Sequence, residues 1–236
     1  MTAPQPYVIA IIPARGGSKG IPRKNILSFQ GKPLLGHTVE QARRARTVNR
    51  VVVSTDDSEI ASTAQHYGAE VVWRPIEISD DTATSESVLL YTLEHLREAG
   101  GCHPDLIVFL QCTSPIRRSV DIDRAVQKLI DDGADSLLSV IPSHCFLWQI
   151  ADGKPRSVNY DHQNRPRRQD LQKQYVENGS IYVFKPWVLH QFKNRLGGKI
   201  VLYEMDPWSA IDINTSEDLA FSETVFSHWC KLQDKG

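Results

Sequence analysis

Residues Tyr7–Asn25 read YVIAIIPARGGSKGIPRKN, an apolar run followed by a glycine-rich basic loop. The run Tyr7–Ile12 is almost wholly apolar, which is typical of a strand buried on both faces of a parallel sheet. Similar short runs recur after it, each separated from the next by about the length of a helix. They are residues 50–54, 70–73, 106–110, 136–141, 179–184 and 200–203. This alternation predicts βαβ units and therefore an α/β protein.

The loop that follows the first run is rich in positive charge. It carries Arg15, Lys19, Arg23 and Lys24, and the chain has no Asp or Glu before Glu40. Glycines let backbone amides approach an anion closely, and the cations can neutralise a polyphosphate. The loop matches neither the Walker A pattern nor the dinucleotide pattern GxGxxG. It predicts a phosphate-binding loop of another kind, with a solvated basic turn as the alternative.

The segments between the strands carry helix signals. Ser58 or Asp57 can cap a helix that ends near Gly68, and Ser85 can cap one that runs to residues 100–101. Further helices are expected at 120–132, after Pro186 and at 216–232. Residues 143–177 are polar and rich in Arg and Gln, with no long apolar strand. We therefore expect a single domain over residues 1–236, with 143–177 as an insertion.

Composition excludes several classes of protein. The chain has 27 Lys and Arg against 28 Asp and Glu, a net charge of −1 that argues against binding nucleic acid. Its four cysteines form no CxxC pair, so neither a zinc cluster nor a disulfide framework is indicated. No apolar run is long enough for a membrane span, and the first residues lack signal-peptide features, so we expect a cytoplasmic protein.

Two other loops follow predicted strands and carry polar groups. Gln111 begins a loop with hydroxyls and a cation after the strand that ends at Leu110, which is also good turn chemistry. Asp212 and Asn214 alternate with apolar residues, so in an extended chain they share one face and offer two oxygen ligands for Mg²⁺. Helix capping by residues 214–216 is the alternative.

A second cationic cluster, Arg165–Asp170, lies in the insertion. Arginine can hold a carboxylate with two parallel hydrogen bonds, so the cluster is suited to an acidic substrate. A solvated charged face is the other interpretation.

The loop Ile11–Asn25 resembles the signature loop of the acylneuraminate cytidylyltransferases, or CMP-sialic acid synthetases. The resemblance covers nearly the whole chain. It extends, in the family's order, through residues 54–57, 74–75, 81–85, 110–115, 167–170, 177–182 and 212–214. It implies a Rossmann-like three-layer fold with a mainly parallel sheet and a small dimerisation insertion. It also implies transfer of CMP from CTP to the anomeric hydroxyl of a sialic-acid-like nonulosonic acid, with Mg²⁺ and with release of pyrophosphate.

The same resemblance assigns roles to residues. Arg15, Lys19 and Lys24 hold the triphosphate, and Asp212 binds the metal with Asn214. Asn25, Arg74 and the segment Ala83–Ser85 contact cytidine. Gln111, Tyr182 and Arg168 contact the sugar acid, and Arg168 reaches across from the partner subunit of a homodimer with shared active sites.

Two positions depart from the family pattern. Many members have a second aspartate where this chain has Asn214, and several sialic-acid-specific members have a cation where it has Leu147. The first departure leaves one carboxylate and one amide oxygen for the metal, and the second leaves the exact sugar open. A cytidylyltransferase for the eight-carbon acid Kdo is one alternative, and a non-catalytic nucleotide-binding regulatory protein is another.

Overall fold

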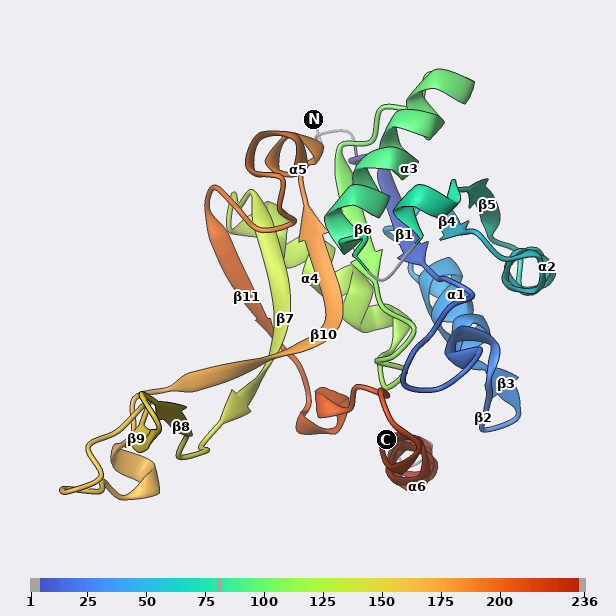
Figure 1. Ribbon diagram of the computed structural model, residues 1–236. Helices are drawn as coiled ribbons and strands as arrows, with labels where there is room; N and C mark the ends of the chain where they lie inside the picture. The colour runs from blue at the N-terminus through green and yellow to red at the C-terminus, as the bar shows by residue number, and fades with distance from the viewer. Residues whose placement is uncertain (1–4, 80–81, 234–236) are drawn as a thin grey trace.

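The computed structural model describes residues 5–79 and 82–233, and the expected family position Asp81 lies outside them. Its centre is a seven-stranded sheet in the order β11-β7-β10-β6-β1-β4-β5 (Figure 1). The strands are β1 Val8–Pro13, β4 Arg50–Thr55, β5 Glu70–Trp73, β6 Leu106–Leu110, β7 Ser136–Ser143, β10 Gln174–Phe184 and β11 Ile200–Glu204. Every pairing is parallel except those of β10, which runs antiparallel to β6 and β7. The predicted α/β sheet is confirmed.

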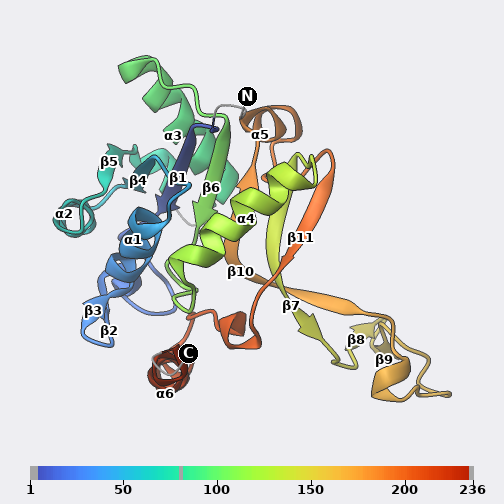
Figure 2. The same cartoon turned by 180° about the vertical axis from the view of Figure 1, so that it is seen from behind.

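Alternating residues of β1 divide the core into two layers, because successive side chains of a strand point to opposite faces. Val8, Ala10 and Ile12 pack with α1 (Leu34–Arg44), α2 (Ser58–His66) and α4 (Ser119–Asp131). Ile9 and Ile11 pack with α3 (Ser85–Gly100) and α5 (Pro186–Phe192). Figures 1 and 2 show these two sets of helices on opposite faces of the sheet. The expected three-layer arrangement is therefore confirmed.

Short elements complete the chain. They are η1 Lys24–Ile26, β2 Ser28–Phe29, β3 Lys32–Pro33, η2 Ile76–Ile78, β8 Trp148–Ala151, β9 Lys154–Ser157, η3 Arg168–Asp170 and η4 Pro207–Ala210. The last helix, α6 (Ser216–Gln233), packs across the end of the molecule through Phe226, whose ring lies 5.1 Å from that of Phe29.

The polar segment 143–177 projects from the body as an arm (Figure 1). It holds the β8–β9 hairpin and η3, and the outer ends of β7 and β10 carry it. Strand β10 begins at Gln174, five residues before the predicted start at Gly179, because its outer part is polar and gave no apolar run. The arm exposes Leu147, Trp148 and Ile150, and the last of these is 73% exposed.

The helix starts refine two expectations. Asp57, not Ser58, caps α2, since its carboxylate accepts hydrogen bonds from the backbone N–H groups of Glu59 and Ile60. Thr84, not Ser85, caps α3. The four cysteines form no disulfide. Within the described residues no helix combines the length and apolar character that crossing a membrane requires.

Candidate active site

A cavity of about 470 Å³ lies beyond the carboxyl end of β1, where the chain connections diverge to the two sides of the sheet. Such switch points are the usual ligand sites of open α/β sheets. The cavity is lined by Pro13, Arg15, Ser18, Lys19, Gly20, Lys24, Asn25, Arg74, Ala83, Thr84, Ser85, Val88, Thr113 and Asn214. It thus brings together eight of the residues singled out from the sequence. Ser18, Thr84 and Thr113 were not singled out, although each belongs to a segment that was.

The basic loop is fixed to the body by Arg23. Its guanidinium donates to both carboxylate oxygens of Asp57, at 2.6 and 3.1 Å, and also pairs with Glu59. The loop has no carboxylate of its own, and the partners of Arg23 come from the start of α2, more than thirty residues later. Arg23 shapes the loop, whereas Arg15, Lys19 and Lys24 line the cavity.

Two glycines of the loop allow close approaches. A Cβ on Gly16 would lie 2.6 Å from Oδ2 of Asp57, and one on Gly20 would collide with the backbone carbonyl of Asn214. Within the loop, the Asn25 side chain donates to the carbonyl of Arg15 at 3.1 Å. The loop is thus closed on itself and pressed against both α2 and the 212–214 segment.

Lys24 connects the loop to the expected metal ligands. Its ammonium donates to the carbonyl of Ile213 at 2.8 Å and to Oδ1 of Asn214 at 3.0 Å. Because an ammonium only donates, this contact fixes the Asn214 amide with its nitrogen toward Asp212 Oδ2, 2.7 Å away. Burial lowers the pKa of Lys24, and the nearby carboxylates of Asp212 and Asp218 oppose that shift.

The helix-capping interpretation is confirmed for Thr215, which caps the start of α6 together with Asp218. Thr215 Oγ1 accepts from the N–H of Asp218, and the Asp218 carboxylate accepts from the N–H groups of Asn214 and Thr215. These hydrogen bonds hold the pKa of Asp218 below its usual range. Capping therefore uses the Asn214 backbone and leaves its side chain to Lys24 and Asp212.

The donor set fits a magnesium ion held mainly by a substrate. The described residues contain no group of three or more His, Cys, Asp or Glu that could hold a metal. Asp212 is exposed beside the cavity-lining Asn214, whose amide oxygen already accepts from Lys24. Magnesium often binds through one or two carboxylates plus substrate phosphates. Asp212 suits that arrangement better than Asn214 does in this conformation.

Arg74 is a buried cation with an unused donor. Its side chain is 3% exposed, and Nη2 lies 3.6 Å from Oδ1 of Asp56. Its Nε has no hydrogen-bond partner among the described residues, and burial lowers the pKa of the guanidinium. A buried donor without a partner is unfavourable, so this N–H destabilises the present arrangement of Arg74 at the wall of the cavity.

Gln111 and Tyr182 do not line the cavity. Gln111 follows β6 and lies against Gly179, where a Cβ would be 2.8 Å from Oε1. Tyr182 stacks on Phe109 with ring centroids 5.3 Å apart, and its hydroxyl donates to Glu177. Burial raises the pKa of this phenol, and the Glu177 carboxylate raises it further, so it remains a neutral donor.

Arg168 lies elsewhere. It is in η3 on the arm and lines a separate hollow of about 610 Å³ between the ends of β7 and β10, with Phe146 and Val176. Figure 1 shows the arm extending away from the loop after β1. Within one chain, Arg168 therefore does not reach the cavity.

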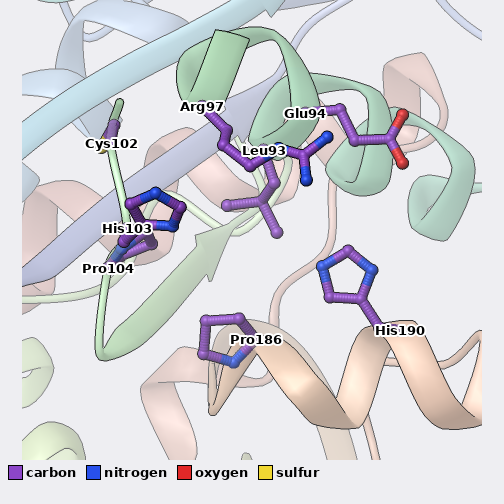
Figure 3. Close-up of a pocket in the computed structure, with 8 residues that line it drawn as sticks. All are labelled: Leu93, Glu94, Arg97, Cys102, His103, Pro104, Pro186 and His190. Atoms are coloured by element: carbon purple, nitrogen blue, oxygen red, sulfur yellow. The ribbon is translucent and has the colours of Figure 1, made fainter. Parts of the chain in front are cut away.

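Another hollow, of about 290 Å³, lies between the C-terminal half of α3 and the start of α5. The rings of His103 and His190 stand on opposite sides of it, and the Glu94 carboxylate points away (Figure 3). Cys102 and His103 come shortly before the start of β6, whereas the basic loop follows the end of the parallel strand β1. This hollow is therefore near the opposite ends of the strands from the basic loop. Its lining shares no residue with the cavity beyond β1.

Comparisons with known proteins agree with this arrangement. A cytidylyltransferase family model matches residues 9–205. N-acylneuraminate cytidylyltransferase A of Danio rerio is 37% identical over 223 residues, covering 92% of this chain and 50% of the relative. Pseudaminic acid cytidylyltransferase of Campylobacter jejuni is 31% identical over 225 residues, covering 92% of this chain and 95% of the relative. The chain thus spans about half the length of the Danio rerio relative.

A solved structure gives the same fold. That of a CMP:2-keto-3-deoxy-manno-octonic acid synthetase complexed with CTP has a TM-score of 0.70 at 18% identity, covering 94% of this chain and 99% of that one. At this identity the likeness concerns the fold alone. The family match and the relative of nearly equal length, together with the basic cavity beyond β1, establish that the chain belongs to the cytidylyltransferases, a family of nucleotide-transferring enzymes.

Proposed function

We propose that this chain transfers CMP from CTP to the anomeric hydroxyl of a nonulosonic acid and releases pyrophosphate. The observation that carries the proposal is the cavity lined by Arg15, Lys19, Lys24, Arg74 and the start of α3. Its cations suit a triphosphate. The named substrates of the relatives, acylneuraminate and pseudaminic acid, favour a nine-carbon acid over Kdo.

The residues suggest a mechanism based on positioning and electrostatics. The cations of the loop would bind the triphosphate and stabilise the negative charge that develops on its oxygens as the sugar hydroxyl attacks the α-phosphorus. Asp212 would hold Mg²⁺ against the same phosphates, and the ion would supply further charge neutralisation. Asn25, Arg74, Ala83 and Ser85 would orient the cytidine. Gln111 and Tyr182 would contact the sugar acid.

We further propose that two copies of the chain complete each other's sites through the arm. Arg168 is the expected carboxylate-binding residue, yet it lines a different hollow in its own chain. The exposed apolar residues of the arm, Leu147, Trp148, Ile150, Val158 and Val176, are suited to burial against a second copy. In such a homodimer the arm of one subunit would bring Arg168 to the partner's Gln111 and Tyr182. The free thiols suit a reducing compartment, and we propose the cytoplasm.

The test is Mg²⁺-dependent release of pyrophosphate from CTP with N-acetylneuraminate, deaminated neuraminate, legionaminate, pseudaminate and Kdo. We expect release with at least one nine-carbon acid. Release with Kdo alone would mean that the substrate is the eight-carbon acid and not a nonulosonic acid. Binding of CTP with no release for any sugar would instead favour a non-catalytic nucleotide-binding role, which Asn214 in place of a second carboxylate would suit.

A further inference from the structure

Asn178 is buried at the centre of a hydrogen-bond network that the proposed reaction does not use directly. Its side chain is 5% exposed. Oδ1 accepts from Ser139 Oγ at 2.6 Å and from the N–H of Ser180 at 3.3 Å, while Nδ2 donates to Ser209 Oγ at 2.9 Å. A backbone N–H can only donate, so the orientation of this amide is fixed.

The oxygen side of the amide lies at an irregularity in β10. The pairing of β10 with β7 changes register between Glu177 and Tyr182. Gly179 lies inside this irregular stretch, with φ of +67°, and faces Gln111. The carbonyl of Asn178 also accepts from Ser114 Oγ at 3.2 Å, which ties the stretch to the loop that carries Gln111. The position of Gln111 therefore depends on the backbone that Asn178 holds.

The nitrogen side of the amide reaches the segment that leads to Asp212. Ser209 belongs to η4 and is buried, and its hydroxyl donates to the carbonyl of Asp206 at 2.7 Å. Three residues later the chain arrives at Asp212, and the N–H of Ile213 donates to the carbonyl of Thr113 at 2.8 Å. The segment is thus held at both ends, by Asn178 before Asp212 and by the Gln111 loop after it.

We propose that Asn178 is a positioning residue that sets Gln111 and Asp212 relative to each other. Its oxygen fixes the sugar-acid side through β10, and its nitrogen fixes the metal side through η4. The roles of Gln111 and Asp212 rest on the proposed function. The geometry of the network does not, and neighbouring serines allow the two halves to be tested separately.

The experiment compares Ser139→Ala with Ser209→Ala. Ser209→Ala removes the stronger of the two partners of the amide nitrogen and leaves only Met205 Sδ, a weak acceptor 3.4 Å away. We expect the dissociation constant of Mn²⁺ from the enzyme–CTP complex, measured by electron paramagnetic resonance, to rise by about fivefold. The KM for the sugar acid should stay unchanged. Ser139→Ala removes a donor to the amide oxygen and also the acceptor of the Ile181 N–H, so it loosens β10 on the sugar-acid side. It should raise that KM by a similar factor and leave Mn²⁺ binding unchanged.

Amide hydrogen exchange is measured on the same variants. Ser139→Ala should speed exchange in residues 111–114, and Ser209→Ala in residues 211–214. The proposal would be overturned if each variant changed exchange equally in residues 111–114 and 211–214. The same holds if each variant changed the Mn²⁺ dissociation constant and the sugar-acid KM together, in proportion to its loss of melting temperature. Asn178 would then be an ordinary core residue. If no sugar releases pyrophosphate with the unmodified protein, the proposed function fails, while Mn²⁺ binding and exchange still decide the role of Asn178.

Discussion

Arg23 and Asp57 are joined by two hydrogen bonds of 2.6 and 3.1 Å, which fix the basic loop to the first turn of α2. The same carboxylate accepts from the N–H groups of Glu59 and Ile60 and so caps the helix. Arg23 has a φ of +58°, a backbone conformation unusual for a residue other than glycine. One side chain of α2 thus stabilises a strained point in the loop that lines the cavity.

Substitutions at Asp57 separate its two roles. Asp57→Ala removes the helix cap and the ion pair and should lower the free energy of unfolding by about 1–2 kcal/mol. Asp57→Asn keeps an oxygen for the cap and loses the ion pair, so its loss of stability should be smaller, because Arg23 is partly exposed. Chemical denaturation measures both. Both variants should bind CTP more weakly, as measured by calorimetry. Unchanged affinity would show that the loop keeps its CTP-binding shape without the Arg23–Asp57 ion pair.

The same pair gives a pH dependence. Partial burial opposes ionisation of Asp57, but the hydrogen bonds from Ile60 and Arg23 hold its pKa below the usual range. A carboxyl group with a lowered folded-state pKa stabilises fully above its unfolded pKa of about 4, and the contribution declines as pH falls through the folded value. Denaturation midpoints of Asp57→Asn should therefore fall less steeply below pH 4 than those of the unmodified protein. The same decline of the midpoints below pH 4 in both proteins would contradict this.

Gly20 and Gly17 form a matched pair within the loop. A Cβ on Gly20 would collide with the carbonyl of Asn214, whereas one on Gly17 would meet nothing within 4 Å. Gly20→Ala should therefore push the loop away from the 212–214 segment and weaken CTP binding by at least about tenfold, the scale of a lost charge-assisted contact. Gly17→Ala should have a much smaller effect. Equal affinities in calorimetry would show that the close approach at Gly20 is dispensable.

The sequence predicted most of the sheet because its central strands are buried on both faces and so read as unbroken apolar runs. It also identified the loops after β1 and β6, since parallel strands bring their carboxyl ends to one edge. It missed the pairing of Arg23 with Asp57, because the two are 34 residues apart and only the fold brings them together. The β8–β9 hairpin was missed for another reason: its exposed side chains produce no hydrophobic period.

The fine geometry of the site depends on contacts that spacing cannot reveal. Asp212 and Asn214 were expected to share one face, yet the Asn214 oxygen turns to Lys24, which is 190 residues earlier. Asn178 belonged to a recognised block but carried no role, because its partners come from three other parts of the chain.

Arg74 is expected to strengthen CTP binding and to lower the stability of the protein without nucleotide. Its buried Nε has no partner in the described residues, so the protein without nucleotide bears an unfavourable donor. We expect Arg74→Met to lower CTP affinity by about tenfold or more while leaving the melting temperature unchanged or higher. Arg74→Lys keeps the charge without the planar donor set and should recover only part of the affinity. A lower melting temperature with normal CTP binding would make Arg74 a structural residue.

Arg15 and Lys19 line the cavity from the basic loop and are expected to act on the triphosphate. Replacing either with alanine should lower kcat/KM by at least about a hundredfold, the scale of losing one group that stabilises transition-state charge. Steady-state pyrophosphate release measures this, with melting temperature as the control for folding. Near-normal turnover in either variant would remove that residue from the proposed mechanism.

If the arm completes the partner's site, the chain should form dimers, and two different inactive variants should complement each other when mixed. Sedimentation should detect a dimer at micromolar concentration, and charged substitutions at Trp148 and Ile150 on the arm should weaken it.

Lys19→Ala should disable the nucleotide cavity of its own chain, and Arg168→Ala should disable the arm that reaches the partner. In an equimolar mixture of the two variants, random exchange makes about half of the dimers mixed, and one of the two sites in each mixed dimer is intact. Activity should therefore rise from near zero to about one quarter of the unmodified level. If Arg168 acted within its own chain, each mixed dimer would contain two damaged sites, and mixing would restore nothing.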